Sequence, residues 1–518
     1  MSNRSLLVRI PAFPFTIDAL RPNRFLATLA AQLLHEQWIT TILDYGTVEG
    51  LERLDPQEPR TELHAVASKS TSITSLLNRW RKTAHPREHS NRQHQMWESI
   101  GREIIDRGDL GFVVFDVARR DDQDALNVII PMIRYYRPSL PIIGVGDFFR
   151  LDESHLVEGV SLFDCIYWGD CDEGFTRFVS TLDRPDDWNE IPFLAYSDSV
   201  RMVITRECDS TACATFATPD YSRSVYPALY DETKLLLFDV EEVRINADNR
   251  AIALKSPAQL TNEVNAIMRD HGSRAFHLLG AMNDYHHAEA LAYEFLARRL
   301  HIRYTRDCHI ASTPTSTVTA LRSSGCYGAS FQIDTGSQRL LDLHYDAGFT
   351  VTEVEQTLRA CLFSNLYTVM HFSYPCIEDD YHTKAETLRV IERVKPNSAP
   401  FSIPSQNHQH KSDLKRRFRA FSKTRSVSDI RHEHNDVIEE VEQCGISTRI
   451  TAPIALMAEL AGFRGQEEEF LEETLFQLMT GDAMGLRAML GILNKNAAQP
   501  DGAVRFKPFS TYRDVVGN

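Results

Sequence analysis

The sequence has no apolar run long enough to span a membrane, and it lacks the short motifs that mark several large enzyme classes. A transmembrane helix needs about 20 consecutive apolar residues, and no such run occurs in the 518 residues. Gly-x-Ser-x-Gly, the Walker phosphate-binding loop and His-Glu-x-x-His are also missing. Their absence argues against a serine hydrolase, a P-loop nucleotidase and a zinc peptidase.

Negative charges outnumber positive charges, and the cysteines do not cluster. The net charge of −15 argues against nucleic acid as a partner, because binding phosphates requires a positive field. The nine cysteines are scattered from Cys165 to Cys444. This is typical of reduced thiols and not of a disulfide framework or a zinc site.

The first residues lack the features of a signal peptide. Arg9 interrupts the first apolar run, and no small-residue cleavage site follows it. We therefore expect a cytoplasmic protein whose partners are small molecules or proteins, and neither nucleic acid nor a membrane. Hydrophobic residues make up 43% and charged residues 25% of the chain, which is ordinary for a globular protein of about two to four domains.

Strand and helix patterns alternate from residue 6 to residue 182. Continuous apolar runs predict buried strands, and apolar residues at helical spacing predict the helices between them. The strands are expected at 6–10, 40–46, 110–119, 141–147 and 163–170, and the helices at 25–38, 95–108, 124–136 and 173–182. This alternation predicts a doubly wound parallel sheet, a Rossmann-like domain over residues 1–190, with ligands beyond the C-terminal ends of the strands. A basic stretch at about 56–94 is either a solvated insertion or a source of phosphate contacts.

A second alternating series follows a connector at 191–233. Its strands are expected at 234–240, 274–280, 302–310, 328–334 and 367–374, and its helices at 257–270, 287–300, 315–323, 351–364 and 383–394. Successive strand and helix units with right-handed crossovers predict a full or partial (β/α) barrel over residues 234–403. A basic linker at 404–431 then leads to a helical region at 432–518, which we expect to act as a small cap or a partner-binding element.

The order of the two modules and several local phrases resemble the cobalamin-binding radical SAM proteins over about residues 5–400. The phrases are LLVRIPAFPF, PIIGVGDFF, YWGDCDEGF, GCYGASFQIDTGSQRLLD and SYPCIEDDYHTKAETLRVIERVKPNS. Such a protein would carry a Rossmann-like cobalamin domain followed by a TIM-like (β/α) barrel that binds S-adenosylmethionine (SAM).

The resemblance places candidate cofactor residues at the ends of strands. Glycines there would let a ligand approach the backbone closely, although turn geometry alone also calls for glycine. The Asp-x-His-x-x-Gly loop of many cobalamin proteins is missing, so the loop after the third strand would lie near the lower face of the cobalt. Trp168 would pack on the corrin or in the core. The candidates are Pro11, Phe13, Asp116, Arg119, Gly144, Gly146, Trp168, Gly169 and Asp170 for cobalamin, and Asp334, Gly336 and Ser337 for SAM.

The cysteine motif on which the chemistry of this family depends has no counterpart in this sequence. Family members have Cys-x-x-x-Cys-x-x-Cys after the first barrel strand, where three thiolates hold a [4Fe–4S] cluster whose fourth iron binds SAM. Here the strand LLLFDVEEV is followed by residues 245–255, which include no cysteine. Cys208 and Cys213 precede the barrel and offer two thiolates, whereas a cluster needs at least three. We therefore expect neither the cluster nor another metal site.

Histidines are weaker candidates for site residues than the residues at the strand ends. His286 and His287 follow the second barrel strand, where a metal or proton-transfer role competes with the favoured surface role at a helix start. The pairs at 408 and 410 and at 432 and 434 lie in polar stretches and are not favoured as metal ligands.

Two functions agree with these patterns. The first is a corrinoid-dependent enzyme of biosynthesis, in which the C-terminal helices close the barrel mouth over a small specialised metabolite. It would perform methyl transfer or bond formation, with catalytic residues unassigned. The second is a non-catalytic corrinoid sensor, carrier or partner subunit of an active radical SAM enzyme. Loss of the cluster ligands favours the second, but retention of the other phrases through the barrel favours an occupied site, and we prefer the enzyme.

Overall fold

The computed structural model describes most of the chain in two compact units. The described residues are 2–12, 16–54, 91–151, 153–169, 173–198, 201–205, 218–223, 234–245, 251–280, 285–345, 347–376, 378–403 and 426–499. The first unit comprises Met1–Leu236 and Glu472–Gly491, and the second comprises Leu237–Leu471 and Ile492–Asn518. Most of the predicted basic insertion and of the basic linker lies outside the described residues.

Seven strands form the sheet of the first unit in the order β2-β1-β3-β4-β5-β6-β7. Strands β1 to β5 are parallel to one another. Strand β6 runs antiparallel to β5, and β7 runs antiparallel to β6. Their bounds are β1 Arg4–Arg9, β2 Ile39–Asp44, β3 Phe112–Asp116, β4 Ile142–Val145, β5 Cys165–Tyr167, β6 Leu194–Ser197 and β7 Met202–Ile204. Strands β3 and β4 are buried at every position, as expected of parallel strands covered on both faces.

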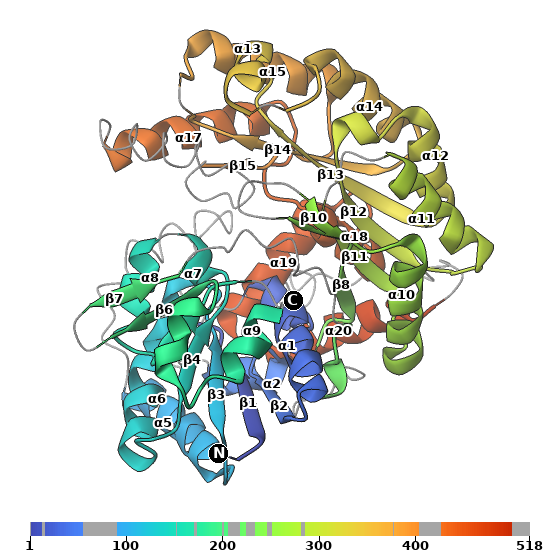
Figure 1. Cartoon of the computed structure of the whole chain (residues 1–518). Coiled ribbons are helices and arrows are strands. Elements are labelled where there is room, and N and C mark those ends of the chain that lie inside the picture. Colours follow the sequence, from blue (N-terminus) through green and yellow to red (C-terminus); the bar gives the residue numbers. More distant parts are fainter. Residues whose placement is uncertain are drawn as a thin grey trace, which may run out of the picture. The chain divides into compact units, whose positions relative to one another are not determined.

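Helices cover both faces of this sheet (Figure 1). Helices α1 and α9 enclose a core with the strands around Leu29, Phe112 and Phe178, while α5 and α6 pack on each other. Asn23 begins α1 because its Oδ1 accepts a hydrogen bond from the Leu26 amide at 2.9 Å. The bounds are α1 Arg24–His35, α2 Val48–Leu54, α5 Asn91–Asp106, α6 Gln123–Tyr136, α7 Phe148–Leu151, α8 Glu153–Gly159 and α9 Glu173–Val179.

Strands β6 and β7 differ from the sequence prediction. Residues 191–233 were expected to form a connector, but the first part of that range extends the sheet as an antiparallel pair. The sheet continues because β5 ends at Tyr167 with one edge open, and Leu194 pairs with it. An edge strand that is covered in this way no longer offers unpaired backbone groups to solvent.

Six parallel strands form the main sheet of the second unit, in the order β15-β14-β13-β12-β11-β8. Each strand neighbours the next one along the chain, so the sheet winds in a single direction, as in a (β/α) barrel. Strands β8 and β15 stand at opposite edges, which makes the barrel partial in the described residues. The bounds are β8 Leu237–Glu241, β11 Ala275–Leu279, β12 Arg303–Cys308, β13 Cys326–Asp334, β14 Tyr367–Ser373 and β15 Phe401–Ser402.

Helices between these strands cover the outer face of the sheet (Figure 1). Phe238 of β8 stacks on His271 of α10 with ring centroids 5.4 Å apart, and Tyr304 of β12 meets Phe295 of α11 at 5.6 Å. Because strand side chains alternate, the intervening positions face the inside of the barrel. The bounds are α10 Pro257–His271, α11 Tyr285–Ala297, α12 Thr315–Ser323, α13 Gln338–Leu340, α14 Val351–Phe363 and α15 Tyr381–Val394.

A short hairpin follows the first barrel strand. After Glu242, β9 (Val243–Ile245) pairs antiparallel with β10 (Ala251–Leu254). The turn at 246–250 lies outside the described residues. The Lys255 amide donates to the Glu242 carbonyl at 3.1 Å and closes the base of the hairpin, and Ser256 then begins α10 with a capping box.

The C-terminal region is helical and is divided between the two units. Its helices are α17 Val427–Gln443, α18 Ala452–Ala461, α19 Glu467–Thr480 and α20 Ala483–Ala497, and the division passes through α19 and α20. Within the described part of the chain, every helix is too short or too polar to cross a membrane.

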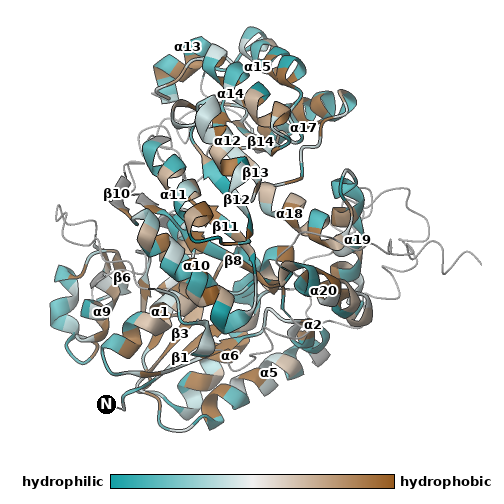
Figure 2. Cartoon of the chain, turned by 90° about the vertical axis from the view of Figure 1, so that its right-hand side faces the viewer, coloured by the Kyte–Doolittle hydropathy of each residue, from teal (hydrophilic) through white to brown (hydrophobic). Residues whose placement is uncertain are grey.

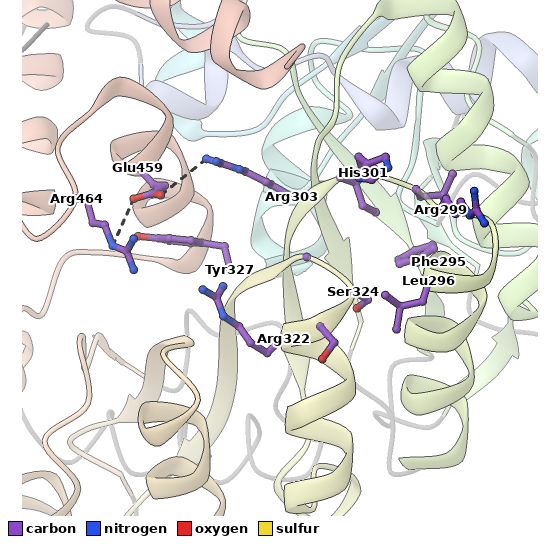
Figure 3. A pocket seen from close by; sticks show the side chains of 14 residues that line it. Phe295, Leu296, Arg299, His301, Arg303, Arg322, Ser324, Tyr327, Glu459 and Arg464 are labelled. Carbon is purple, nitrogen blue, oxygen red and sulfur yellow. Dashed lines mark ion pairs between the residues drawn. The ribbon is translucent and has the colours of Figure 1, made fainter. Parts of the chain in front are cut away.

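Helix α18 lies at the N-terminal ends of the barrel strands. Glu459 near its end is 3.8 Å from both Arg303, which begins β12, and Arg464 (Figure 3). The helix is mostly buried and is coloured mainly as hydrophobic in Figure 2. The expectation that the C-terminal helices close the barrel mouth is therefore wrong for α18. Helix α17 does reach that end, because His434 Nδ1 lies 2.7 Å from the Tyr374 carbonyl oxygen just past β14.

Candidate functional site

The first sheet reverses its winding direction between β1 and β3. Strand β2 lies on one side of β1, and β3, β4 and β5 follow on the other. In doubly wound sheets with this order, ligands bind beyond the C-terminal ends of the strands at the reversal. Pro11, which is buried, follows β1, and Asp116 ends β3. The structure therefore brings these two predicted residues to the edge where the fold favours a ligand.

Asp116 is a buried carboxyl that accepts a hydrogen bond from a neutral side chain. It is 8% exposed, and its Oδ2 accepts a hydrogen bond from Asn23 Nδ2 at 2.7 Å. Among the described residues, no cationic side chain forms an ion pair with it. Burial raises the pKa of Asp116 to about 7; the charge of Arg9 opposes this shift and Asp147 adds to it. Carboxyls that exchange a proton near neutral pH gather at functional sites.

Asp122 fastens the loops after β1 and β3 to each other. Its Oδ1 accepts from the Ala12 amide at 2.8 Å, and its Oδ2 accepts from the amides of Ala118 at 3.1 Å and Arg119 at 2.9 Å. The Arg119 side chain donates to the Ala12 carbonyl oxygen at 2.9 Å and lies 3.5 Å from Asp122. Arg119 thus holds the loop after β1 in place, and its predicted contact with a cofactor stays a prediction.

The predicted glycines of this sheet each meet protein where a side chain would stand. Gly146 has a φ of +114°, and a Cβ there would come within 2.4 Å of the Val117 carbonyl oxygen. At Gly144 a Cβ would lie 2.8 Å from a phenylalanine ring, and at Gly169 it would lie 2.7 Å from a tyrosine hydroxyl. Packing inside the protein is enough to require glycine at all three positions, so a role in cofactor binding stays a prediction.

Trp168 presents a buried hydrogen-bond donor just past β5. It is half-buried, and its ring meets Phe193 edge to face with centroids 5.0 Å apart. Its indole Nε1 is buried and has no hydrogen-bond partner among the described residues. A buried indole usually finds an acceptor, so this donor is suited to a ligand. The other two predicted residues here, Phe13 and Asp170, lie outside the described residues.

Polar side chains line the inner face of the partial barrel. His277 of β11 and Thr305 of β12 are neighbours in the sheet, with Nδ1 and Oγ1 2.9 Å apart. The other ring nitrogen of His277 lies 3.8 Å from Asp307 Oδ1. Asp307 Oδ2 accepts from the Gly280 amide at 3.2 Å. This group lies toward the C-terminal ends of the strands, where barrel active sites are found.

His371 of β14 belongs to the same group. Burial lowers the pKa of His371 below its ordinary value; Asp307 and Asp334 oppose this shift and His277 reinforces it. A lowered pKa favours the neutral imidazole, which is the form that a general base requires.

Asp334 ends β13 in a strained backbone conformation. Its φ is +67°, which is uncommon for a residue other than glycine. Its Oδ1 accepts hydrogen bonds from Gln332 Nε2 at 2.6 Å and from Ser373 Oγ at 2.9 Å. Strain that neighbouring contacts maintain is typical of ligand-binding positions.

Gly336 and Ser337 follow Asp334 and differ in what they contact. A Cβ at Gly336 would come within 2.5 Å of the Thr387 Cα, and the Gly336 amide donates to Thr387 Oγ1 at 2.9 Å. Gly336 therefore allows β13 to approach α15. Ser337 is fully buried, and its Oγ has no hydrogen-bond partner within the described ranges.

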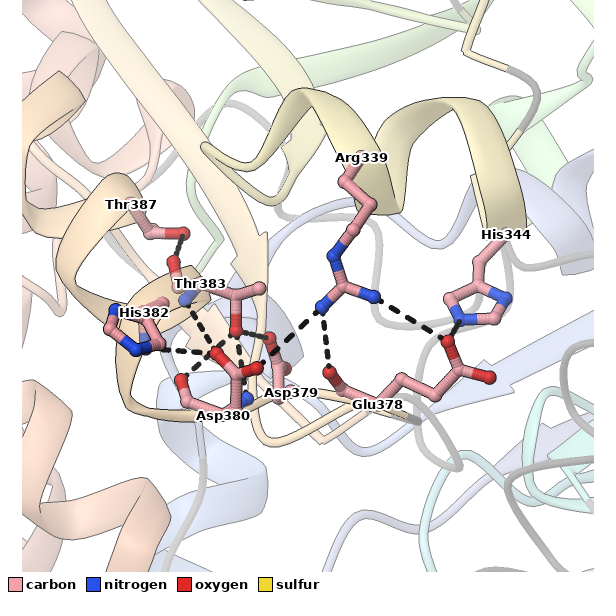
Figure 4. A network of polar contacts seen from close by, with 8 residues as sticks. All are labelled: Arg339, His344, Glu378, Asp379, Asp380, His382, Thr383 and Thr387. Carbon is pink, nitrogen blue, oxygen red and sulfur yellow. Dashed lines mark hydrogen bonds and ion pairs between the residues drawn. The ribbon is translucent and has the colours of Figure 1, made fainter.

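A charged network holds the loop after β14 beside the residues that follow β13 (Figure 4). Arg339 lies 3.6 Å from Glu378 and 3.8 Å from Asp380, and His344 lies 3.5 Å from Glu378. Asp379 accepts hydrogen bonds from a backbone amide at 2.7 Å and a threonine hydroxyl at 3.0 Å. Burial raises the pKa of Asp379 to about 6.

Glu242, the first residue after β8, is completely buried and paired. Arg306 donates to its two oxygens from Nε at 2.9 Å and Nη2 at 2.5 Å, and His287 Nε2 lies 3.2 Å away. Burial alone would raise the pKa of Glu242, but the charge of Arg306, the nearby His287 and the hydrogen bonds from Arg306 hold it below its ordinary value. His287 is 7% exposed, so the surface role favoured for it is wrong.

The described cysteines are free and, except for Cys444, buried. Burial raises the pKa of the Cys308 and Cys326 thiols, which makes them poor thiolate ligands. Across the described part of the chain, no three His, Cys, Asp or Glu side chains are placed to hold a metal ion. Cys208 and Cys213 lie outside that part, and the expected loss of the cluster stays a prediction.

Solved structures with similar architecture identify the fold. One is the radical S-adenosylmethionine methyltransferase TsrM from Kitasatospora setae with tryptophan substrate and the SAM analogue aza-SAM bound; it is 14% identical, covers 77% of this chain and 73% of its own, and has a TM-score of 0.54. A second TsrM structure, with cobalamin and a [4Fe–4S] cluster bound, covers 78% of this chain and 75% of its own at a TM-score of 0.54.

The cobalamin-dependent S-adenosylmethionine radical enzyme OxsB, with aqua-cobalamin and S-adenosylmethionine bound, is 13% identical. The match covers 81% of this chain but only 55% of OxsB, with a TM-score of 0.52. The chain therefore has the fold of cobalamin-dependent radical SAM enzymes. No protein-family model and no curated protein matches the sequence.

Sequence reasoning anticipated this fold but missed the polar group inside the barrel. His277, Asp307 and His371 were not among the predicted site residues. His277 and His371 each stand among apolar neighbours, as in AFHLL and TVMHFS, whereas Asp307 stands in the more polar strand RYTRDC. A single polar residue on the inner face of a barrel strand is the signal that would have found the two histidines.

Proposed function

We propose that this protein is a cobalamin-binding enzyme related to the radical SAM enzymes that acts without a [4Fe–4S] cluster. Its substrate would be a small specialised metabolite, and its reaction a corrinoid-dependent methyl transfer or bond formation. One observation carries the proposal: in a chain with this fold, the first barrel strand leads into a hairpin segment that contains no cysteine.

The switch point of the first unit supplies the residues proposed to hold cobalamin. Pro11, Asp116 and Arg119 stand on the loops at the strand reversal, and Trp168 follows β5. The fit is supported by the buried Asp116 carboxyl, with its pKa of about 7, and by the buried Trp168 donor. Bound cobalamin would supply the methyl-transfer chemistry itself. The protein's part is to bind and orient the cofactor and to exclude water.

The inner face of the barrel supplies the residues proposed to act on the substrate. The neutral His371 imidazole would accept a proton from the substrate, and the nearby carboxylates of Asp307 and Asp334 would stabilise the imidazolium that results. Asp334 and Ser337 would also hold SAM, if SAM is the methyl donor. The buried Ser337 hydroxyl supports this assignment.

Anaerobic purification with added hydroxocobalamin tests the proposal. The absorption spectrum measures bound corrinoid, and chemical assays measure iron and sulfide. We expect one corrinoid per chain and no iron. Trp168→Ala should weaken corrinoid binding, whereas the matched control Trp188→Phe, which lies in the core of the same sheet, should not. Failure to bind corrinoid would refute the proposal, and about four irons per chain would show that a cluster is present.

The alternative is a non-catalytic corrinoid sensor, carrier or partner subunit. The absence of cysteine from residues 245–255 favours it, because a protein that has lost its reactive centre can retain its binding site. The two functions are separated by His371→Asn. If the protein is an enzyme, the variant should bind corrinoid normally and lose the change in the cobalt spectrum that substrate induces during turnover. A sensor would show no turnover with either protein.

A further inference from the structure

An arginine-lined cavity lies at the N-terminal ends of barrel strands β12 and β13, which is the end opposite the proposed substrate site. Its volume is about 560 Å³. The C-terminal ends of α11 and α12, together with α18 and the residues after it, form its walls. A cavity of this size is ample for a small-molecule ligand, since such pockets hold roughly 300–1,000 Å³.

The lining of this cavity is strongly cationic in an acidic protein. Arg299, Arg303, Arg322 and Arg464 share the lining with a single carboxylate, that of Glu459. A second carboxylate, that of Glu467, lies outside the lining but close enough to act on Tyr327. If histidines are left out of the count, the lining has an excess of three positive charges, whereas the whole chain carries a net charge of −15 on the same count. Such a local concentration of like charge costs free energy unless an anion offsets it.

The contacts of Arg299, Arg322 and Arg464 do not account for this concentration of positive charge. Glu459 is shared by Arg303 and Arg464 at 3.8 Å from each, close to the limit of an ion pair. No carboxylate of the described residues forms an ion pair with Arg299 or Arg322. Arg322 donates to the Cys326 carbonyl oxygen at 3.2 Å, which leaves the rest of its guanidinium for another acceptor.

The dipoles of the neighbouring helices offset only part of the excess positive charge. Arg322 lies in the last turn of α12, and Arg299 follows the end of α11. Each helix C-terminus is equivalent to roughly half a negative charge, so the two ends offset about one of the three excess positive charges. The positive charge that remains calls for an anion.

The shape of the cavity indicates a second, apolar part of the ligand. Phe295, Leu296 and Ile302 contribute an apolar wall, and the Tyr327 ring lies beside the guanidinium groups of Arg322 and Arg464 (Figure 3). Burial raises the pKa of Tyr327 above its ordinary value, so its hydroxyl stays a neutral hydrogen-bond donor. Arginine forks match the oxygens of phosphate groups in bidentate geometry.

We propose that this cavity is a binding site for a small phosphorylated molecule of nucleotide size. The arginines bind its phosphates, and the apolar wall and the Tyr327 ring contact the rest of it. The site does not depend on the corrinoid chemistry proposed above, because it lies at the other end of the barrel strands. Its ligand would be bound away from the residues proposed to act on the substrate.

Isothermal titration of the full-length protein with ADP, pyrophosphate and adenosine tests the site. We expect ADP and pyrophosphate to bind with one site per chain, ADP more tightly, and adenosine not to bind. Arg322→Gln and Arg464→Gln should each weaken ADP binding by about tenfold or more, as expected for a lost charge-assisted hydrogen bond. Both side chains are exposed enough for the variants to fold, which circular dichroism will verify.

Arg298→Gln is the matched control. Arg298 is exposed near the end of the same helix α11, but it pairs with Glu294 and Asn262 outside the cavity. This variant should bind ADP as the unmodified protein does. The proposal is overturned if neither phosphate compound binds, if adenosine binds as tightly as ADP, or if Arg298→Gln weakens binding as much as Arg322→Gln.

Discussion

Asp116 and Glu242 are buried carboxyls in equivalent places, and their surroundings differ. Each stands at the C-terminal end of a parallel strand, Asp116 in the first unit and Glu242 in the second. Glu242 has a bidentate arginine partner, and its pKa is held below the ordinary value. Asp116 accepts a hydrogen bond from the neutral amide of Asn23, and burial raises its pKa to about 7.

This contrast separates a structural pair from a functional candidate. A fully compensated buried carboxylate joins elements, here β8, β12 and α11, and leaves no capacity for a ligand. A carboxyl whose charge is only partly compensated can change its protonation state when a ligand approaches. The carboxylate that follows β8 is therefore compensated by protein, whereas the carboxyl that ends β3 can still respond to a ligand.

The largest expected effect comes from breaking the Glu242 pair. Arg306→Met leaves an uncompensated buried carboxylate and should lower the free energy of unfolding by about 3–5 kcal/mol. Thermal and urea unfolding measure the loss. The double variant Glu242→Gln with Arg306→Met should recover most of it, and Arg298→Gln should leave the transition unchanged. A loss below about 1 kcal/mol would mean that the pair is not a structural one.

A pH series distinguishes the two carboxyls by the sign of the effect. The folded pKa of Asp116, about 7, lies above its ordinary value of 3.8. Between pH 3.8 and about pH 7, the folded state therefore binds more protons than the unfolded state. The stability that Asp116 contributes is fully present below pH 3.8 and is lost as the pH rises through 7. Asp116→Asn should gain stability relative to the unmodified protein between about pH 5 and about pH 8, by about 1–3 kcal/mol.

Glu242→Gln should show the opposite trend. Because the folded pKa of Glu242 is lowered, its contribution is present above its ordinary value and is lost on acidification. The variant should therefore be less stable than the unmodified protein at neutral pH, and the difference should shrink as pH falls. If both variants shift stability in the same direction, the contrast between the two sites is refuted.

The smallest expected effect is a shift in the pKa of His371. NMR titration of the imidazole protons measures this shift. Asp307→Asn removes a charge that raises this pKa, so it should lower the pKa further; His277→Gln should raise it. Shifts of about half a unit to one unit are expected for charges at this range. If the pKa of His371 is unchanged in both variants, His371 does not interact with Asp307 and His277.

The order of strands and helices could be predicted from the sequence with good accuracy. Predicted strands at 110–119, 141–147, 274–280 and 367–374 contain the observed β3, β4, β11 and β14. Continuous apolar runs and helical spacing are local properties, so they can be recognised without tertiary contacts. The α/β class, with parallel sheets, follows from their alternation. Strands β6 and β7 were missed because an antiparallel edge pair depends on the neighbour that it meets.

The candidate site was only partly predictable for the same reason. Asp116 and Asp334 were found through their places in local phrases, but the arginine cavity and the group around His371 assemble residues from several strands. No local pattern reports that Arg306, on the helix-covered side of β12, neutralises Glu242. Nor does one report that α18 covers the N-terminal ends of the strands.

By itself, the sequence determined the alternation of elements, the acidic charge and the absence of cysteine after the first barrel strand. Only the tertiary structure decided which buried carboxyl is paired and which is left to titrate, and where the arginines converge. The physical reason is that apolar periodicity is a property of one short chain segment. Burial and charge compensation depend instead on which distant segments come into contact.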